Sequence, residues 1–205
     1  MLFKKIASDM LGLSDIGSVI KPQDYDKVDA DDYVMHEDNE KIYFLIKSKT
    51  DEYCFTNKAL IHVDGTSAVS QKRTLKRYNY YEYPVSKVTL ETAGTIDLDA
   101  EIKFRLGSHD FSIDVHKQFI EELKDLYKSL LAIEEMIKEN HAALDFAKES
   151  LRLSADILNR VSAAESNIVE QFKGLNEATF SWLTEKTKQF NVKDFGFVFE
   201  KYINN

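Results

Sequence analysis

The sequence contains few of the residues that cross-link or interrupt a chain. Its 205 residues include one cysteine, two prolines and seven glycines. The single cysteine, Cys54, excludes an intrachain disulfide and a cysteine-based zinc site within one chain, and it agrees with a reducing, cytoplasmic location. No activating neighbour is visible, so Cys54 is expected to be an unreactive thiol that is buried or half-buried. The scarcity of proline and glycine argues against a linker-rich chain.

The sequence also lacks a long hydrophobic run. No stretch of about 18 apolar residues occurs, so we expect no transmembrane helix. Asp9 interrupts the apolar N-terminal segment and no small-residue cleavage site follows, so we do not interpret this segment as a signal peptide. Its apolar residues have helical spacing: Leu2, Phe3, Ile6, Met10 and Leu13. A short amphipathic helix is predicted here, which packs on the domain or binds a membrane surface or a partner.

Positive charge is in deficit. The chain has 27 Lys and Arg against 35 Asp and Glu, a net charge of -8. Non-specific affinity for nucleic acids and anionic membranes comes mostly from neutralising phosphate charge, so we expect no nucleic-acid partner. Acidic residues are dense in residues 21–40, which we interpret as a solvated connection with a short helix near residues 31–36.

Residue sets typical of catalysis or cofactor binding are missing. The sequence has no Gly-rich phosphate loop and no G-x-S-x-G motif. Its five histidines include no pair at a spacing of three or four, and the acidic segment contains no EF-hand loop. We therefore predict no catalytic residues, no cofactor and no bound metal, and we expect that the protein is not an enzyme.

From residue 41, apolar and polar residues alternate with a period of two. This pattern predicts half-buried β-strands separated by short turns, of which Asp64-Gly65 is a hairpin signal. The predicted strands cover residues 41–47, 52–56, 59–63, 70–81, 85–92, 101–106 and 111–115. Seven short strands at hairpin spacing suit an antiparallel sandwich or a partly open barrel.

The pattern becomes helical after His116, and residues 117–173 contain no glycine or proline. One apolar set recurs at steps of seven: Leu123, Leu130, Ile137, Leu144, Leu151 and Leu158. A second set fills the complementary positions: Leu126, Ile133, Ala147, Val161, Ile168 and Leu175. These heptads predict helices that pack on one another, with a break near Asn140 or between Asn159 and Ser166. A further helix follows Gly174, and the apolar residues 195–203 are expected to dock on the same chain or on a neighbour.

Two segments resemble bacterial pleckstrin-homology (PH) domains. Residues 55–61 are F-T-N-K-A-L-I, followed by Asp64-Gly65; residues 91–94 are E-T-A-G, followed by D-L-D-A-E at 97–101. The resemblance covers residues 1–130, and the helical remainder, 131–205, resembles the extension of the YvbH-like subgroup. The family often has Arg where this chain has Ala59, so any role of that Arg is absent here.

The resemblance implies an α+β fold. It would be a PH-like, seven-stranded, antiparallel, partly open barrel capped by a C-terminal helix, preceded by a short N-terminal helix and followed by a helical extension, either a hairpin or a bundle. The family also implies ring-like homo-oligomers, and it implies no defined ligand. The motif residues that we expect to determine the fold are Thr56, Asn57, Leu60, Ile61, Glu91, Thr92, Gly94, Asp97 and Asp99.

One predicted strand mixes basic and aromatic side chains, a combination that binds single-stranded nucleic acid or an acidic peptide. The candidate binding residues are Lys72, Arg73, Lys76, Arg77, Tyr78 and Tyr80. Alternation divides these charges between two faces, so we favour an edge strand that is protected by charge or paired with a neighbouring subunit. Phosphoinositide binding is not expected, because the first hairpin loop, residues 47–51, is short and contains an acid.

These observations predict a non-catalytic binding or oligomerisation module, a scaffold or adaptor that assembles with its own copies or with a protein partner. Pairing at strand edges and packing of the helices would supply the contacts. The alternative is a peripheral membrane or stress-related adaptor that uses the N-terminal helix with Lys4 and Lys5.

Overall fold

The computed structural model describes residues 16–65, 73–92, 99–161 and 168–203. They belong to two compact units: Met1–Glu134 together with Lys193–Asn205, and Glu135–Val192. The predicted N-terminal helix and the candidate residues Lys72, Gly94 and Asp97 lie outside the described residues. The domain boundary at residue 130 stays a prediction.

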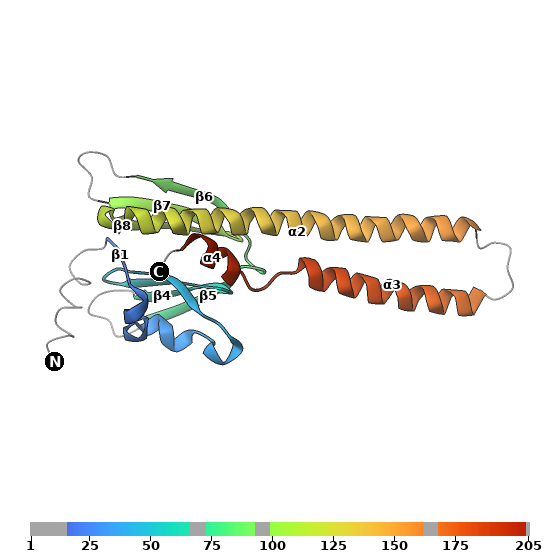
Figure 1. The fold of residues 1–205 in the computed structure, drawn as a ribbon, viewed down its shortest axis with the longest axis horizontal. Helices are drawn as coiled ribbons and strands as arrows, with labels where there is room; N and C mark the ends of the chain where they lie inside the picture. Colours follow the sequence, from blue (N-terminus) through green and yellow to red (C-terminus); the bar gives the residue numbers. More distant parts are fainter. Residues whose placement is uncertain (1–15, 66–72, 93–98, 162–167, 204–205) are drawn as a thin grey trace. The chain divides into compact units, whose positions relative to one another are not determined.

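A five-stranded antiparallel sheet forms the first half of the barrel (Figure 1), in the order β1-β2-β3-β4-β5. Its strands are β1 (Ser18–Val19), β2 (Ile42–Lys47), β3 (Asp51–Thr56), β4 (Ala59–Gly65) and β5 (Arg73–Asn79). A three-stranded antiparallel sheet forms the second half, in the order β6-β7-β8. Its strands are β6 (Val85–Glu91), β7 (Asp99–Leu106) and β8 (His109–His116). The seven strands expected from the alternation are confirmed, and β1 is an additional short strand.

The two sheets face each other and share an apolar core. The rings of Phe55 on β3 and Phe104 on β7 lie 5.8 Å apart, and those of Tyr78 on β5 and Phe111 on β8 lie 5.2 Å apart. Gly17 joins the sheets on one side, because its N–H donates to the Asp114 carbonyl at 2.7 Å. On the other side β5 and β6 each have one strand neighbour among the described strands, so the barrel is open there.

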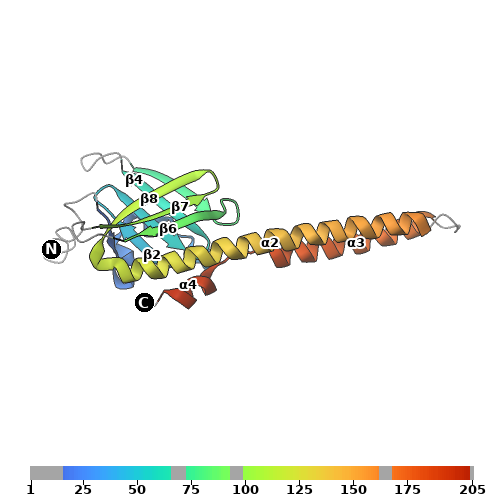
Figure 2. The same ribbon diagram turned by 90° about the horizontal axis from the view of Figure 1, so that it is seen from above.

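The helix α2 (Ile120–Val161) begins directly after a short 3-10 turn and caps the barrel (Figure 2). The apolar heptad positions of its first turns are fully buried: Leu123, Leu126, Leu130 and Ile133. Ion pairs at a spacing of three, between Lys124 and Glu121 and between Lys128 and Asp125, lie on its exposed side. The periodicity that predicted the helix therefore also identified the face that closes the core.

The predicted break near Asn140 is wrong, because α2 continues through that residue to Val161. An asparagine inside a helix costs less than about 1 kcal/mol relative to alanine, which does not end a helix that lacks glycine and proline. The next helix, α3, runs from Ile168 to Phe190. The helix therefore ends within the other predicted interval, between Asn159 and Ser166.

The acidic residues 21–40 are not simply solvated, which corrects the sequence interpretation. They form three short 3-10 helices: Pro22–Lys27, Asp29–Tyr33 and His36–Asp38. Val28, Ala30 and Val34 pack in one buried cluster with residues of β2, β3 and β4 such as Leu45 and Ile61. These strands are consequently buried on both faces in their middle, where simple alternation predicted one exposed face.

Candidate interaction site

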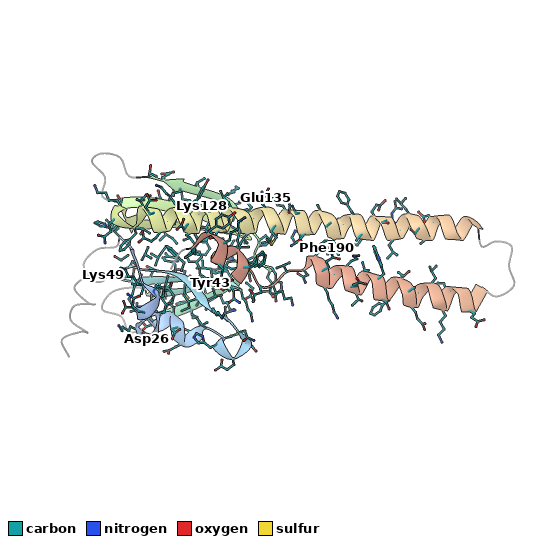
Figure 3. All side chains as sticks on the ribbon, viewed as in Figure 1. Asp26, Tyr43, Lys49, Lys128, Glu135 and Phe190 are labelled. Atoms are coloured by element: carbon teal, nitrogen blue, oxygen red, sulfur yellow. The ribbon has the colours of Figure 1, made fainter. Side chains whose placement is uncertain are left out.

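The C-terminal helix α4 (Gly196–Tyr202) docks on the barrel of the same chain. Phe195 and Phe199 are completely buried, and Val198 is nearly so. Figure 3 labels Tyr43, which lies on β2 beside α4. Of the two alternatives for the apolar residues 195–203, the structure shows docking on the same chain.

Aromatic side chains of the barrel form the surface that receives α4. The ring of Tyr43 stacks on Phe199 with centroids 5.3 Å apart. Tyr80 contacts both Phe195 and Phe199, at centroid distances of 5.9 and 6.3 Å. Lys193 places its Nζ 4.7 Å from the centre of the Tyr81 ring, a cation–π contact. We call the surface made by Tyr43, Asn57, Tyr80 and Tyr81 the α4 seat.

Asn57 supplies the polar contacts of the α4 seat. Its side-chain Nδ2 donates to Asp194 Oδ2 at 2.6 Å, and its carbonyl accepts from the Phe195 N–H at 2.7 Å. The Asn57 Oδ1 accepts from the Lys41 N–H at 2.8 Å, which holds the amide in one orientation. At the other end of α4, the Tyr43 hydroxyl donates to Glu200 Oε1 at 2.7 Å. Asn57 therefore couples the turn between β3 and β4 to a segment 137 residues away.

Gly196 permits the close approach of α4. A Cβ at this position would lie 2.9 Å from the Tyr43 hydroxyl and 3.3 Å from the Asn57 Cβ. We expect Gly196→Ala to lower the free energy of unfolding by about 1–3 kcal/mol, because an added methyl group must displace packed neighbours. Thermal denaturation checks this against Gly174→Ala in α3, where a Cβ would meet no atom within 4 Å. That control is expected to be neutral or stabilising by up to about 1 kcal/mol, and equal effects would contradict the packing argument.

Thr56, the neighbour of Asn57, belongs to a buried ionic cluster. Its hydroxyl donates to Glu40, a residue that is only 1% exposed. Arg77 Nη2 donates to Glu40 Oε1 at 2.8 Å, and the Met35 N–H donates to Glu40 Oε2 at 2.9 Å. Burial raises the pKa of Glu40, but these hydrogen bonds and the Arg77 charge outweigh it, so the pKa lies below its ordinary value. Glu40 is therefore held as a carboxylate.

The structure places the candidate binding residues of β5 next to acidic partners. Arg73 lies 3.7 Å from Asp29, and Lys76 Nζ lies 3.0 Å from Asp64. Arg77 is bound to Glu40, as described, while Tyr78 and Tyr80 are buried in the core. The described cations of this strand thus have carboxylate neighbours in the same chain.

The other motif residues have different surroundings. Leu60 and Ile61 are buried in β4, and Glu91 is exposed with its carboxylate 2.9 Å from Lys103. Thr92 is exposed after β6, and Asp99 opens β7 opposite His116. Of these five motif residues, only the two in β4 are buried, and Ile61 belongs to the cluster that Val28, Ala30 and Val34 complete.

The helical unit Glu135–Val192 begins at Glu135 and ends two residues after Phe190, both labelled in Figure 3, and almost none of its described side chains is buried. Both views show its two helices, the distal part of α2 and α3, side by side. Among its described side chains only Ile137 is buried. Its exposed large apolar residues are Phe146 (75%), Leu153 (50%), Phe172 (66%), Leu175 (41%) and Phe180 (73%).

Features associated with chemistry are sparse in the described part of the chain. Cys54 is completely buried, and burial raises the pKa of its thiol. A shallow cavity of about 280 Å³ at β6–β8 is lined by Lys87, Lys103, Phe104, Asp110, Phe111 and Ser112. Lys103 is held there by Glu91 and Glu101. Within the described residues, no group of three His, Cys, Asp or Glu side chains could hold a metal ion, and no helix could cross a membrane.

The sequence did not reveal the partners of the motif residues. Thr56 and Asn57 stood out, but Glu40 and Asp194, which they bind, did not. A polar contact between distant segments produces no periodic pattern in the sequence from which it could be predicted. The one usable signal was the density of aromatic residues after Lys193, which indicated docking without indicating where.

Two facing antiparallel sheets, open at one side and capped by a helix, define a PH-like domain, here with a helical extension. Residues 10–134 match the family described as "Bacterial PH domain", and residues 145–205 match the family described as "YvbH-like oligomerisation region". The chain belongs to the bacterial PH domain family and carries the YvbH-like oligomerisation region.

Relatives agree with this assignment. The chain is 63% identical over 204 residues, 100% of both chains, to "Uncharacterized protein YvbH" of Bacillus subtilis (strain 168). It is 33% identical over 98 residues, 47% of this chain and 76% of the relative, to "Uncharacterized protein YjqA" of the same organism. The crystal structure of a PH-domain-containing bacterial protein from Exiguobacterium sibiricum 255-15 is similar with a TM-score of 0.86 and 55% identity, covering 93% of this chain and 100% of that chain.

Proposed function

We propose that the protein is a non-catalytic self-assembly module in which the helical unit 135–192 pairs with the same unit of a second copy. The observation that carries this proposal is the absence of a core among the described side chains of that unit, together with its exposed phenylalanines. The match of residues 145–205 to an oligomerisation region supports the same assignment. The barrel would serve as the folded body that the assembly brings together.

The exposed apolar residues are arranged so that a second helix can cover them. Phe146 and Leu153 are seven residues apart on α2 and therefore share one face. Half-buried Leu144, Ala147 and Leu151 lie on a different face of the same helix. A helix with apolar residues on two faces needs more than one neighbour, which a four-helix arrangement of two copies would supply.

The free edge of β5 is the second candidate contact in this proposal. β5 pairs with β4 alone among the described strands, and its residues Arg73–Lys76 are exposed, Leu75 included at 43%. Unpaired strand edges form hydrogen bonds with another chain unless charge protects them. Of the candidate residues on this strand, we propose the exposed Arg73 and Lys76 for the edge contact, because Tyr78 and Tyr80 are buried in the core and Arg77 is bound to Glu40. Because its described cations have carboxylate neighbours, a strongly anionic partner such as a nucleic acid is not proposed.

The test replaces two exposed phenylalanines in the helical unit, Phe146→Ser and Phe180→Ser, in one chain. Burying one such side chain contributes about 1.5–3 kcal/mol, so the double variant should weaken association by about 100-fold or more. Light scattering on a size-exclusion column measures the molar mass. The wild type is expected to be an oligomer and the double variant a monomer at micromolar concentration.

Met35→Ser is the matched control, because Met35 is 47% exposed but lies on the barrel. It should leave the oligomer intact. A double variant that keeps the wild-type mass would contradict the helical contact and leave the β5 edge as the next candidate.

A further inference from the structure

The contacts between the α4 seat and the α4 segment join residues that are far apart in the sequence. The contacts of the α4 seat are made by the side chains and backbone of Tyr43, Asn57, Tyr80 and Tyr81, which precede α4 by more than a hundred residues. α4 itself is a helix of seven residues, too short to be stable without a surface to pack on. None of these contacts requires that the barrel and α4 belong to the same chain.

The connection between α3 and α4 is short. α3 ends at Phe190 and α4 begins at Gly196, with no regular secondary structure between them. Six Cα–Cα steps join Phe190 to Gly196, so a fully extended connection spans at most about 22 Å. The connection therefore limits how far from the end of α3 the helix α4 can dock, on its own chain or on a second copy.

One apolar face of α3 is only partly covered within its own chain. Thr179 and Trp182 are half-buried, whereas Phe172 and Leu175, one heptad earlier on the same face, are 66% and 41% exposed. The apolar length of α3 is therefore greater than the length that its own chain covers. In the proposed assembly, the α2 helix of a second copy would cover Phe172 and Leu175.

α2 and the α4 seat are fixed to the same barrel, because the first turns of α2 and the residues from Lys193 both belong to the barrel unit. An α3 that packs on the α2 of a second copy is thus directed to that copy's barrel. We propose that in the assembled protein α4 occupies the α4 seat of a second copy, so that each barrel is completed by its partner's C-terminal helix. This exchange rests on the self-assembly proposed above, and exchange of an identical element is a low-cost route to oligomers.

Cross-linking tests the exchange directly. One chain carries Lys193→Cys and the other carries Tyr81→Cys; the wild-type side chains are in contact, and Lys193 is exposed. The two chains are unfolded together, refolded, and treated with a short bis-maleimide. Cys54 is buried and should not react. A covalent dimer is expected in the mixture and not in either variant alone, and Phe199→Ala in the Lys193→Cys chain should abolish it.

A chain that carries both cysteines separates the possible outcomes. Exchange predicts a covalent link between chains, and docking on the same chain predicts only a link within one chain. Light scattering of the untreated sample gives the mass. An oligomer with links only within chains would overturn the exchange and leave the self-assembly standing, whereas a monomer would overturn both.

Discussion

Phe199→Ala is expected to lower the free energy of unfolding of the barrel by about 3–5 kcal/mol, the cost of deleting a fully buried phenylalanine. Phe199 is 0% exposed and contacts the rings of Tyr43 and Tyr80. Removal of its ring would leave a cavity where α4 meets the α4 seat. Urea denaturation, monitored by far-UV circular dichroism, measures the loss of stability.

The same helix supplies the control. Phe197 lies two residues earlier and is 55% exposed, so Phe197→Ala is expected to change stability by no more than about 0.5 kcal/mol. A similar loss for both variants would mean that α4 is not seated as the structure shows. A negligible effect of Phe199→Ala would mean that α4 does not stabilise the barrel.

Glu40→Ala is the second substitution with a large expected effect, about 3–5 kcal/mol of destabilisation. The change removes the carboxylate that binds the Arg77 guanidinium and the Thr56 hydroxyl, and so leaves a mostly buried cation without its partner. Glu37→Ala, at an exposed position three residues earlier, is the control and should be nearly neutral. Chemical denaturation at neutral pH compares the two, and equal small effects would contradict the proposed role of the cluster.

The same carboxylate gives a pH dependence of stability. Its pKa is lower in the folded protein than its ordinary value of 4.5, because the hydrogen bonds from Arg77, Thr56 and Met35 outweigh the effect of burial. Folding then favours the ionised form, so the stabilisation is present above the unfolded pKa and is lost as pH falls through the folded pKa. The difference in stability between wild type and Glu40→Gln should shrink as pH falls below about 4.5. A difference independent of pH would show that the charge is not what stabilises the cluster.

Local patterns in the sequence were sufficient to predict most elements of the fold. Alternation predicted all seven longer strands, and the heptad identified the face of α2 that carries Leu123 and Leu130. Burial of one face of a strand or helix repeats with a fixed period, so the spacing of apolar residues in the sequence predicts it. The break near Asn140 failed because a polar residue at a heptad position does not end a helix.

Contacts between distant segments explain what the sequence did not predict. The acidic segment 21–40 covers the outer face of the first sheet because a few apolar residues, Val28, Ala30 and Val34, are interspersed among its acids. Asn57 was recognised as a motif residue, but its bond to Asp194 spans 137 positions and has no counterpart in spacing or composition. The sequence therefore singled out individual residues of the α4 seat, such as Asn57 and Tyr80, but it did not predict that they lie together.

The basic residues of β5 illustrate the same limit for a candidate site. Arg73, Lys76 and Arg77 suggest a cationic surface when read along the strand. Their neighbours Asp29, Asp64 and Glu40 come from two other segments, and they change the charge that a partner would meet. Only the fold brings these carboxylates to the strand.

Sedimentation equilibrium of the unmodified chain, over concentrations from below to above the micromolar range, tests the central claim most directly. The exposed apolar faces of the helical unit predict a reversible association with a mass that is a whole multiple of the chain mass. A single species of monomer mass at every concentration would contradict the account.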